Sequence, residues 1–168
     1  MITDRDYKVV EFVDKIPCYG DTIKKIFFTD VSSRVCYKRL AFLHDYLYIR
    51  RSRHGANDKY FYYTKREPAQ KKHLDLLART YLWLIKEGYK VDIQTVQSQI
   101  GNIRPDMTAY IERNGKKAYM AIEIQRMFDS EKLKKYEESD FKKLLYVSDR
   151  KITSSKLDII NLNIKELP

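Results

Sequence analysis

The stretch that most constrains the fold is Ile103–Gln125, which reads IRPDMTAYIERNGKKAYMAIEIQ. Apolar residues alternate through Ile103–Ile111 and again through Ala118–Ile124, with Asn114-Gly115 between the two runs. Asn-Gly between alternating runs is the strongest short-range signal for a β-hairpin with a two-residue turn. The sequence therefore predicts two antiparallel strands joined by a tight turn.

Polar residues lie at the open end of this predicted hairpin. Asp106 follows Pro105 near the start of the first strand, and Glu123-Ile124-Gln125 ends the second. Because side chains alternate across a strand, Glu123 and Gln125 point to the same face. Mg²⁺ prefers oxygen ligands such as carboxylates. We therefore expect a candidate Mg²⁺ site with Asp106 and Glu123 as its ligands.

Length and composition limit the classes of protein to which this chain can belong. The chain has 168 residues, of which 43% are hydrophobic and 33% charged, so it can bury a core and keep a polar surface. No run approaches the ~20 apolar residues that a membrane span needs, and the N-terminal MITDRDYKVVEF has no apolar signal-peptide core. We expect a cytoplasmic protein with no membrane partner. No Gly-rich phosphate loop occurs, so we expect no nucleotide cofactor.

The chain is strongly basic, with a formal net charge of +10. A basic excess of this size favours a polyanionic partner, and nucleic acid is the usual one. Net charge alone is also compatible with a basic protein that binds no polyanion.

Residues 1–66 show three helical patterns followed by a hairpin pattern. Thr3-Asp4 begins the first helix, which Pro17 ends; Asp21-Thr22 begins a short second helix, and Ser32-Ser33 begins the third. The predicted hairpin, Tyr46–Thr64, has strands at Tyr46–Ile49 and Tyr60–Tyr63.

Three helices followed by a basic hairpin are the layout of a winged helix-turn-helix, in which a helix enters the major groove and the hairpin contacts phosphates or the minor groove. We therefore expect residues 1–66 to form a DNA-binding domain. An alternative is a protein-interaction module of the same shape. The expected DNA contacts are Ser32, Ser33, Arg34, Tyr37, Lys38 and Arg39 on the third helix, and Arg50, Arg51, Arg53 and Lys59 on the hairpin.

Residues 67–168 show a different pattern from residues 1–66, because predicted helices and strands are interspersed. This order predicts an α+β domain with a mixed sheet. The predicted elements besides the central hairpin are helices at Gln70–Lys86, Ser130–Ser139 and Thr153–Leu157, and strands at Lys90–Ile100, Phe141–Val147 and Ile159–Leu167.

This order of elements resembles the core of the PD-(D/E)xK, or restriction-endonuclease-like, nuclease fold. Asp106 and Glu123 match the two acids of its motif, and Gln125 stands where most members have Lys. The resemblance implies a Mg²⁺-dependent DNA endonuclease in which the acids hold the metal and Gln125 positions water. A third acid often comes from the first helix, and Asp75 is the candidate. The alternative is an inactive relic of such a nuclease.

A narrower resemblance covers nearly the whole chain. The set Thr3, Asp6, Arg39, Leu40, His73, Leu74, Pro105, Asp106, Glu123, Gln125, Arg126, Lys132, Leu133 and Tyr136 is similar to the pattern of the replication-relaxation family, whose members occur on plasmids, phages and conjugative elements of Gram-positive bacteria. This resemblance implies double-stranded DNA binding in replication, transfer or its regulation. The nuclease-like domain would then supply a second DNA surface or a homodimer contact. A third function, an adaptor in a replication or transfer complex, also stays open.

Overall fold

The computed structural model describes residues 1–125 and 129–168. Arg126, which belongs to the replication-relaxation pattern, lies outside the described residues. The chain divides into two compact units, Met1–Arg79 and Thr80–Pro168. The division falls inside helix α4, Lys71–Lys86, whereas our expected boundary after residue 66 precedes that helix.

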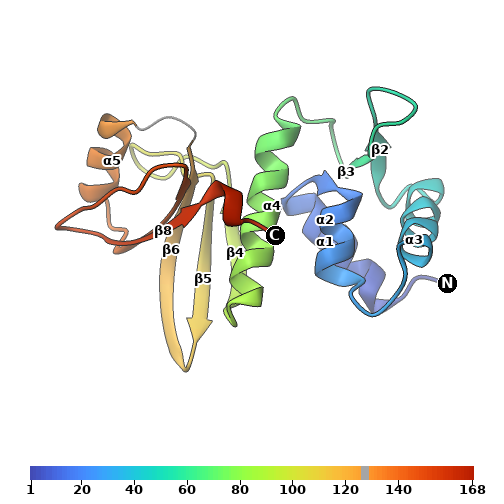
Figure 1. Cartoon of the computed structure of the whole chain (residues 1–168), viewed down its shortest axis with the longest axis horizontal. Helices are drawn as coiled ribbons and strands as arrows, with labels where there is room; N and C mark the ends of the chain where they lie inside the picture. The colour runs from blue at the N-terminus through green and yellow to red at the C-terminus, as the bar shows by residue number, and fades with distance from the viewer. Residues whose placement is uncertain (126–128) are drawn as a thin grey trace. The chain divides into compact units, whose positions relative to one another are not determined.

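The N-terminal unit contains three helices and a small antiparallel sheet (Figure 1). The strand order is β1-β3-β2, so β1, which precedes α2, pairs with the last strand of the hairpin. The elements are α1 Asp4–Lys15, β1 Cys18–Tyr19, α2 Gly20–Phe27, α3 Ser33–Asp45, β2 Arg50–Ser52 and β3 Phe61–Tyr63.

Two predicted helix starts are confirmed by their caps. Thr3 caps α1 in a reciprocal box in which its hydroxyl accepts from the Asp6 amide, and the Asp6 carboxylate accepts from the Thr3 amide at 2.6 Å. Ser32 caps α3 by accepting from the Val35 amide. The second helix begins one residue earlier than predicted, at Gly20.

Gly20 sets the approach of α2 to α3. A Cβ at this position would lie 2.7 Å from Cε1 of Tyr37, closer than two carbons tolerate. The absence of a side chain therefore lets the Tyr37 ring of α3 lie against the first turn of α2.

The predicted strand Tyr46–Ile49 is wrong. The amides of Leu47 and Tyr48 donate to the carbonyls of His44 and Leu43, which closes the end of α3. Leu47 adopts a left-handed conformation with φ 63°, and the strand begins only at Arg50. The helix-closing hydrogen bonds outweigh the strand preference of this aromatic run, and leave Tyr46, Leu47 and Tyr48 exposed.

The C-terminal unit contains a five-stranded mixed sheet with order β4-β5-β6-β7-β8. The first three strands are antiparallel, and β6, β7 and β8 are parallel. The α+β class and the mixed sheet are thus confirmed. The elements are β4 Lys90–Val96, β5 Met107–Arg113, β6 Lys116–Ile124, α5 Ser130–Glu137, β7 Lys143–Ser148, β8 Asp158–Asn163 and the 3₁₀ turn η1 Ile164–Glu166.

The predicted central hairpin is confirmed with its turn. Arg113 lies opposite Lys116, and Asn114 and Gly115 have φ of 52° and 74°. Two successive positive φ angles are those of the turn type that matches the twist of hairpin strands. The register that follows decides which side chains meet at the other end of β5 and β6.

Two predictions at the end of the chain are wrong. Residues Thr153–Leu157 form no helix; instead, the hydroxyl of Ser154 accepts from the amides of Lys156 and Leu157, which is a local turn. The last strand stops at Asn163, not Leu167, because the Asn163 side chain accepts from the Lys165 amide and begins η1.

Helix α5 covers one face of the sheet around the end of β6 (Figure 1). A buried cluster fills the contact and includes Ala121, Tyr136, Phe141, Leu144 and Tyr146. The last five residues of β6 are all buried, so the Glu123 side chain lies inside the unit rather than at a solvated edge.

Candidate functional site

The predicted acidic pair meets where β5 begins and β6 ends. Met107 lies opposite Ile122, so Asp106, just before Met107, and Glu123, just after Ile122, are neighbours across the two strands. Both are buried, with relative exposures of 9% and 2%. The Ile124 amide donates to Oδ2 of Asp106 at 2.8 Å. The backbone of one strand therefore fixes the carboxylate carried by the other.

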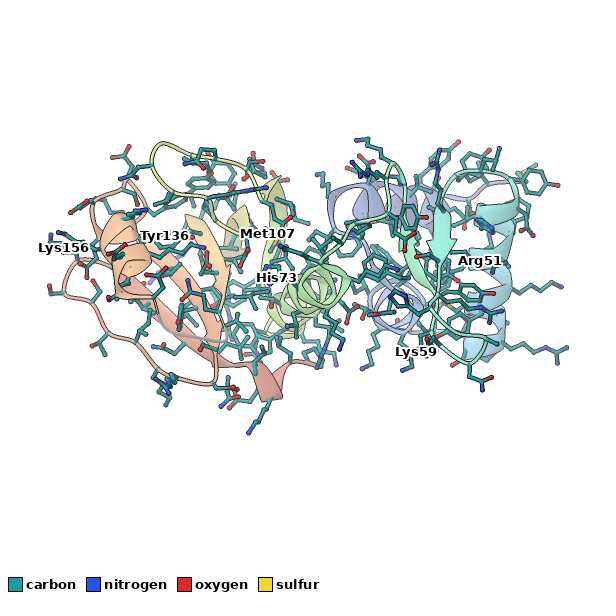
Figure 2. The ribbon with its side chains drawn as sticks, turned by 90° about the horizontal axis from the view of Figure 1, so that it is seen from above. Arg51, Lys59, His73, Met107, Tyr136 and Lys156 are labelled. Carbon is teal, nitrogen blue, oxygen red and sulfur yellow. The ribbon has the colours of Figure 1, made fainter. Side chains whose placement is uncertain are left out.

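Glu123 is held from α5 on both of its oxygens. The Lys132 ammonium donates to Oε1, and the Tyr136 hydroxyl donates to Oε2 at 2.8 Å. Residues four apart share one helix face, so a single helix turn presents both donors, and Tyr136 lies at the sheet side of α5 (Figure 2). Asp129 caps α5 by accepting from the amides of Glu131 and Lys132.

The electrostatics of the pair explain this arrangement. Burial raises the pKa of Glu123, the nearby charge of Asp106 raises it further, and Lys132 and Tyr136 oppose both effects. Burial and the Glu123 charge also raise the pKa of Tyr136, so its hydroxyl stays a donor. The buried Glu123 carboxylate is thus tolerated because one ammonium and one hydroxyl bind it, while Asp106 accepts from the Ile124 amide.

Gln125 lies beside the acids, as the alternation predicted. Its amide nitrogen donates to Oε1 of Glu123 at 3.3 Å, and its amide oxygen accepts from the Tyr146 hydroxyl at 3.1 Å. The small pocket next to these groups has about 10 Å³ for the centre of a water molecule, room for about one water. The amide is therefore oriented, but the pocket is narrow.

The donor set suits a hard cation only in part. Two carboxylates and an amide are oxygen ligands of the kind that Mg²⁺ takes. Both oxygens of Glu123, however, already accept from Lys132 and Tyr136. Within residues 1–125 and 129–168, no three His, Cys, Asp or Glu side chains form a group that could hold a metal. A metal at Asp106 and Glu123 would have to displace the Lys132 ammonium.

Asp75, the expected third acid, has partners in the N-terminal unit. Its Oδ1 accepts from the Tyr19 amide at 3.0 Å and from the Thr22 hydroxyl at 2.8 Å. Tyr19 is the N-cap of α2 and provides no side-chain cap, so Asp75 supplies the missing acceptor from α4. Burial raises the pKa of Asp75 despite these hydrogen bonds.

The exposed face of α3 carries part of the predicted DNA surface. Ser33, Arg34 and Lys38 are exposed, and Arg34 and Lys38 are one turn apart. Ser32 is exposed as well, but its hydroxyl caps the helix. Arg34 and Lys38 form the basic stripe of α3.

Three other predicted DNA residues have carboxylate partners. Tyr37 and Lys59 both donate to Asp21 of α2. Arg39 donates to both oxygens of Asp6, which is only 1% exposed. Arg39 therefore anchors α3 to the capping box of α1.

The hairpin β2–β3 carries three arginines, which we call the wing arginines: Arg50, Arg51 and Arg53. The guanidinium groups of Arg51 and Arg53 lie 4.4 and 4.7 Å from the centre of the Tyr60 ring, and Arg53 donates to the Ala56 carbonyl at 2.6 Å. Figure 2 labels Arg51 on β2 and Lys59 near the start of β3. Stacking on the Tyr60 ring limits the rotamers of Arg51 and Arg53. A guanidinium has five N–H donors, so donors other than the one that binds the Ala56 carbonyl can reach phosphates.

Sequence reasoning missed the role of Lys132. The helical pattern of Ser130–Ser139 puts Leu133 and Tyr136 inward and predicts a mostly solvated Lys132, whereas Lys132 is the counter-ion of Glu123. The available signal was the spacing of Lys132 and Tyr136, which places an ammonium and a hydroxyl on one turn of the helix that follows Glu123.

No protein-family model matches this chain, and no curated protein matches it either. None of the helices in the described part of the chain is both long and apolar enough to cross a membrane.

Proposed function

We propose that this chain is a double-stranded DNA-binding protein of a plasmid, phage or conjugative element, acting in replication, transfer or its regulation. The observation that carries DNA binding is the pair of basic surfaces on one unit: the stripe of Arg34 and Lys38 on α3, and the wing arginines of the β2–β3 hairpin, two of which stack on Tyr60. The assignment to a mobile element rests on the replication-relaxation pattern alone.

The order of elements supports a winged helix-turn-helix. A short strand lies between α1 and α2, and two strands with a basic connection follow α3. The sheet order β1-β3-β2 holds this hairpin beside the helices. In such a domain α3 enters the major groove and the hairpin meets phosphates or the minor groove.

The test is duplex binding measured by fluorescence anisotropy over a series of salt concentrations. Replacing the three wing arginines with Ala should weaken binding to all sequences and lower the slope of log K against log salt by roughly 3, because each lost phosphate contact removes about 0.9. Lys8→Ala/Lys15→Ala/Lys65→Ala, which removes three exposed lysines of the same unit, is the control matched for charge. Equal affinity and slope in wild type and wing variant would rule out this surface.

A second candidate function is a Mg²⁺-dependent nickase of the PD-(D/E)xK type. It is favoured by four side chains that meet where β5 begins and β6 ends: Asp106, Glu123, Gln125 and Lys132. Strands β4, β5 and β6 are antiparallel, and the chain then passes through α5 to β7, which is parallel to β6. With Mg²⁺ bound in place of the ammonium, Asp106 and Glu123 would hold it and the ion would activate water. Lys132, once displaced, would remain beside the site as a cation for the DNA phosphate.

Nicking of supercoiled plasmid with Mg²⁺ or Mn²⁺ separates the two candidates. A nickase loses activity in Glu123→Gln and keeps it in Tyr119→Phe, a change at an exposed tyrosine. Absence of cutting by wild type, with duplex binding intact, would leave the acids a structural role. A protein that neither binds duplex nor cuts it would point to the adaptor function.

A further inference from the structure

A basic hollow lies at the Asn114-Gly115 turn that joins β5 and β6, at the opposite end of β6 from Glu123. Its volume is about 680 Å³, within the range of about 300–1,000 Å³ typical of ligand pockets. Four of its lining residues are cationic, and none is acidic: Arg113, Lys116, Lys117 and Lys143. We call these four the hairpin cations.

Apolar and aromatic residues line the hollow together with the hairpin cations. Ile111 of β5 lies opposite Ala118 of β6, and Ile160 of β8 lies beside them in the lining. The guanidinium of Arg113 lies 5.0 Å from the centre of the Tyr89 ring, which also lines the hollow. Stacking on Tyr89 therefore orients one of the cations before any ligand arrives.

The hairpin cations differ in how their charge is balanced. Lys117 lies 3.7 Å from Glu112, and Lys143 is paired with Asp158. Neither Arg113 nor Lys116 forms an ion pair with any residue that the structure describes. Two of the four positive charges in the hollow are therefore left without a counter-charge.

The two unpaired cations are also direct neighbours. Arg113 and Lys116 face each other across the turn as a registered cross-strand pair. Like charges directly opposite each other destabilise a hairpin. An anion between them would relieve this repulsion, and the guanidinium fork of Arg113 fits a phosphate in a bidentate manner.

We propose that the basic hollow binds phosphate groups, and that their source is the backbone of nucleic acid. The choice of DNA as the source rests on the proposed function, whereas the recognition of phosphate rests on the hollow alone. In the DNA-bound protein, the hollow gives the C-terminal unit phosphate contacts of its own. The other source of the same chemistry is a free nucleotide.

Two variants of the full chain test the hollow. Arg113→Ala/Lys116→Ala removes both unpaired charges. Lys116→Glu places a carboxylate opposite Arg113, which keeps the hairpin folded because it replaces a repulsive pair by an attractive one. Lys134→Ala/Lys135→Ala, two exposed lysines of α5, is the charge-matched control in the same unit.

Anisotropy with a random-sequence duplex is measured for each variant over a salt series. Both hollow variants should bind duplex about tenfold or more weakly at moderate salt, and the double variant should lower the salt slope by roughly 2. The control should match wild type, and the thermal midpoint of Lys116→Glu should equal or exceed that of wild type. Hollow variants that bind duplex and nucleotide as wild type does would overturn the proposal.

The same experiment separates the hollow from the wing. Loss of duplex affinity in the hollow variants but not in the wing-arginine variant supports phosphate binding by the hollow and rules out phosphate contacts by the wing arginines. If wild type binds no duplex, calorimetry with ATP and with inorganic phosphate decides: binding that Arg113→Ala/Lys116→Ala abolishes supports a phosphate site for a free ligand. Absence of all binding overturns both proposals.

Discussion

The Lys132 ammonium of α5 donates to Oε1 of Glu123, nine residues earlier in the chain, and is the counter-ion of that buried carboxylate. Tyr136, one turn further along α5, occupies the other oxygen. The motif that resembles a metal site therefore already contains a cation of the protein's own. The effects of the Lys132 ammonium on stability and on metal binding can be measured separately.

Lys132→Met should destabilise the protein by about 1–3 kcal/mol at neutral pH, because it leaves a buried carboxylate without its counter-ion. The pKa of Glu123 is raised in the folded protein. Its carboxylate is therefore protonated at low pH, where the lost ammonium no longer matters. The difference in unfolding free energy between wild type and Lys132→Met should therefore grow as pH rises through the folded pKa of Glu123.

Urea unfolding of wild type and Lys132→Met at several pH values measures this deficit. Lys134→Met, on the exposed side of the same helix, is the control and should be nearly neutral. A deficit that stays constant with pH would mean that Lys132 stabilises the unit by packing alone.

Mg²⁺ and Lys132 should compete for Glu123. Since a metal must displace the ammonium, Lys132→Ala should bind Mg²⁺ and Mn²⁺ more tightly than wild type, and adding Asp106→Asn should remove the gain. Isothermal titration calorimetry on the three proteins measures this. Unchanged affinity in Lys132→Ala would contradict this competition, and a gain that survives the added Asp106→Asn would show that the metal does not bind at the acids.

Asp6→Asn should cost about 2 kcal/mol at neutral pH. Burial would raise the pKa of Asp6, but hydrogen bonds from Arg39 and Thr3 outweigh it and lower the pKa from 3.8 to about 2, a shift worth about 2 kcal/mol. A lowered pKa stabilises the fold above the unfolded pKa, and this contribution is lost as pH falls toward 2. Acid unfolding curves should therefore be shallower for Asp6→Asn than for Asp4→Asn, which changes an exposed carboxylate.

Leu47→Gly should stabilise the protein by roughly 0.5–1 kcal/mol. Leu47 has φ 63° at the end of α3 and is 85% exposed, so Gly relieves backbone strain and removes little packing. Tyr46→Gly, at φ −92°, should instead be neutral or destabilising. Thermal unfolding of both variants checks the prediction, and equal midpoints would argue against strain at Leu47.

Local signals predicted the hairpin and the acidic pair. Asn114-Gly115 defines its own turn, and the turn fixes the register that sets Asp106 opposite Glu123. Helix starts at Thr3 and Ser32 were predictable for the same reason, because a cap acts over three residues.

Features that depend on tertiary packing were not predictable in the same way. The contact of Lys132 with Glu123 exists only once α5 packs on the sheet, and sequence alone made Lys132 a solvated residue. The carboxylate of Asp75 accepts from the first turn of α2, 53 and 56 residues away, and no local pattern gives such a partner. At Tyr46–Ile49, helix closure overrode strand propensity.

The register of the sheet has a consequence for the order of folding. Strands β5 and β6 are joined by a two-residue turn, whereas β6 and β7 are parallel and must wait for α5 to cross over. Hairpins of this kind form in about 1–10 μs, and parallel pairing is slower because of its loop-closure entropy. The two carboxylates therefore come together before the Lys132 ammonium that pairs with Glu123 has docked. We expect refolding to accelerate in mild acid, where protonation removes the repulsion during that interval.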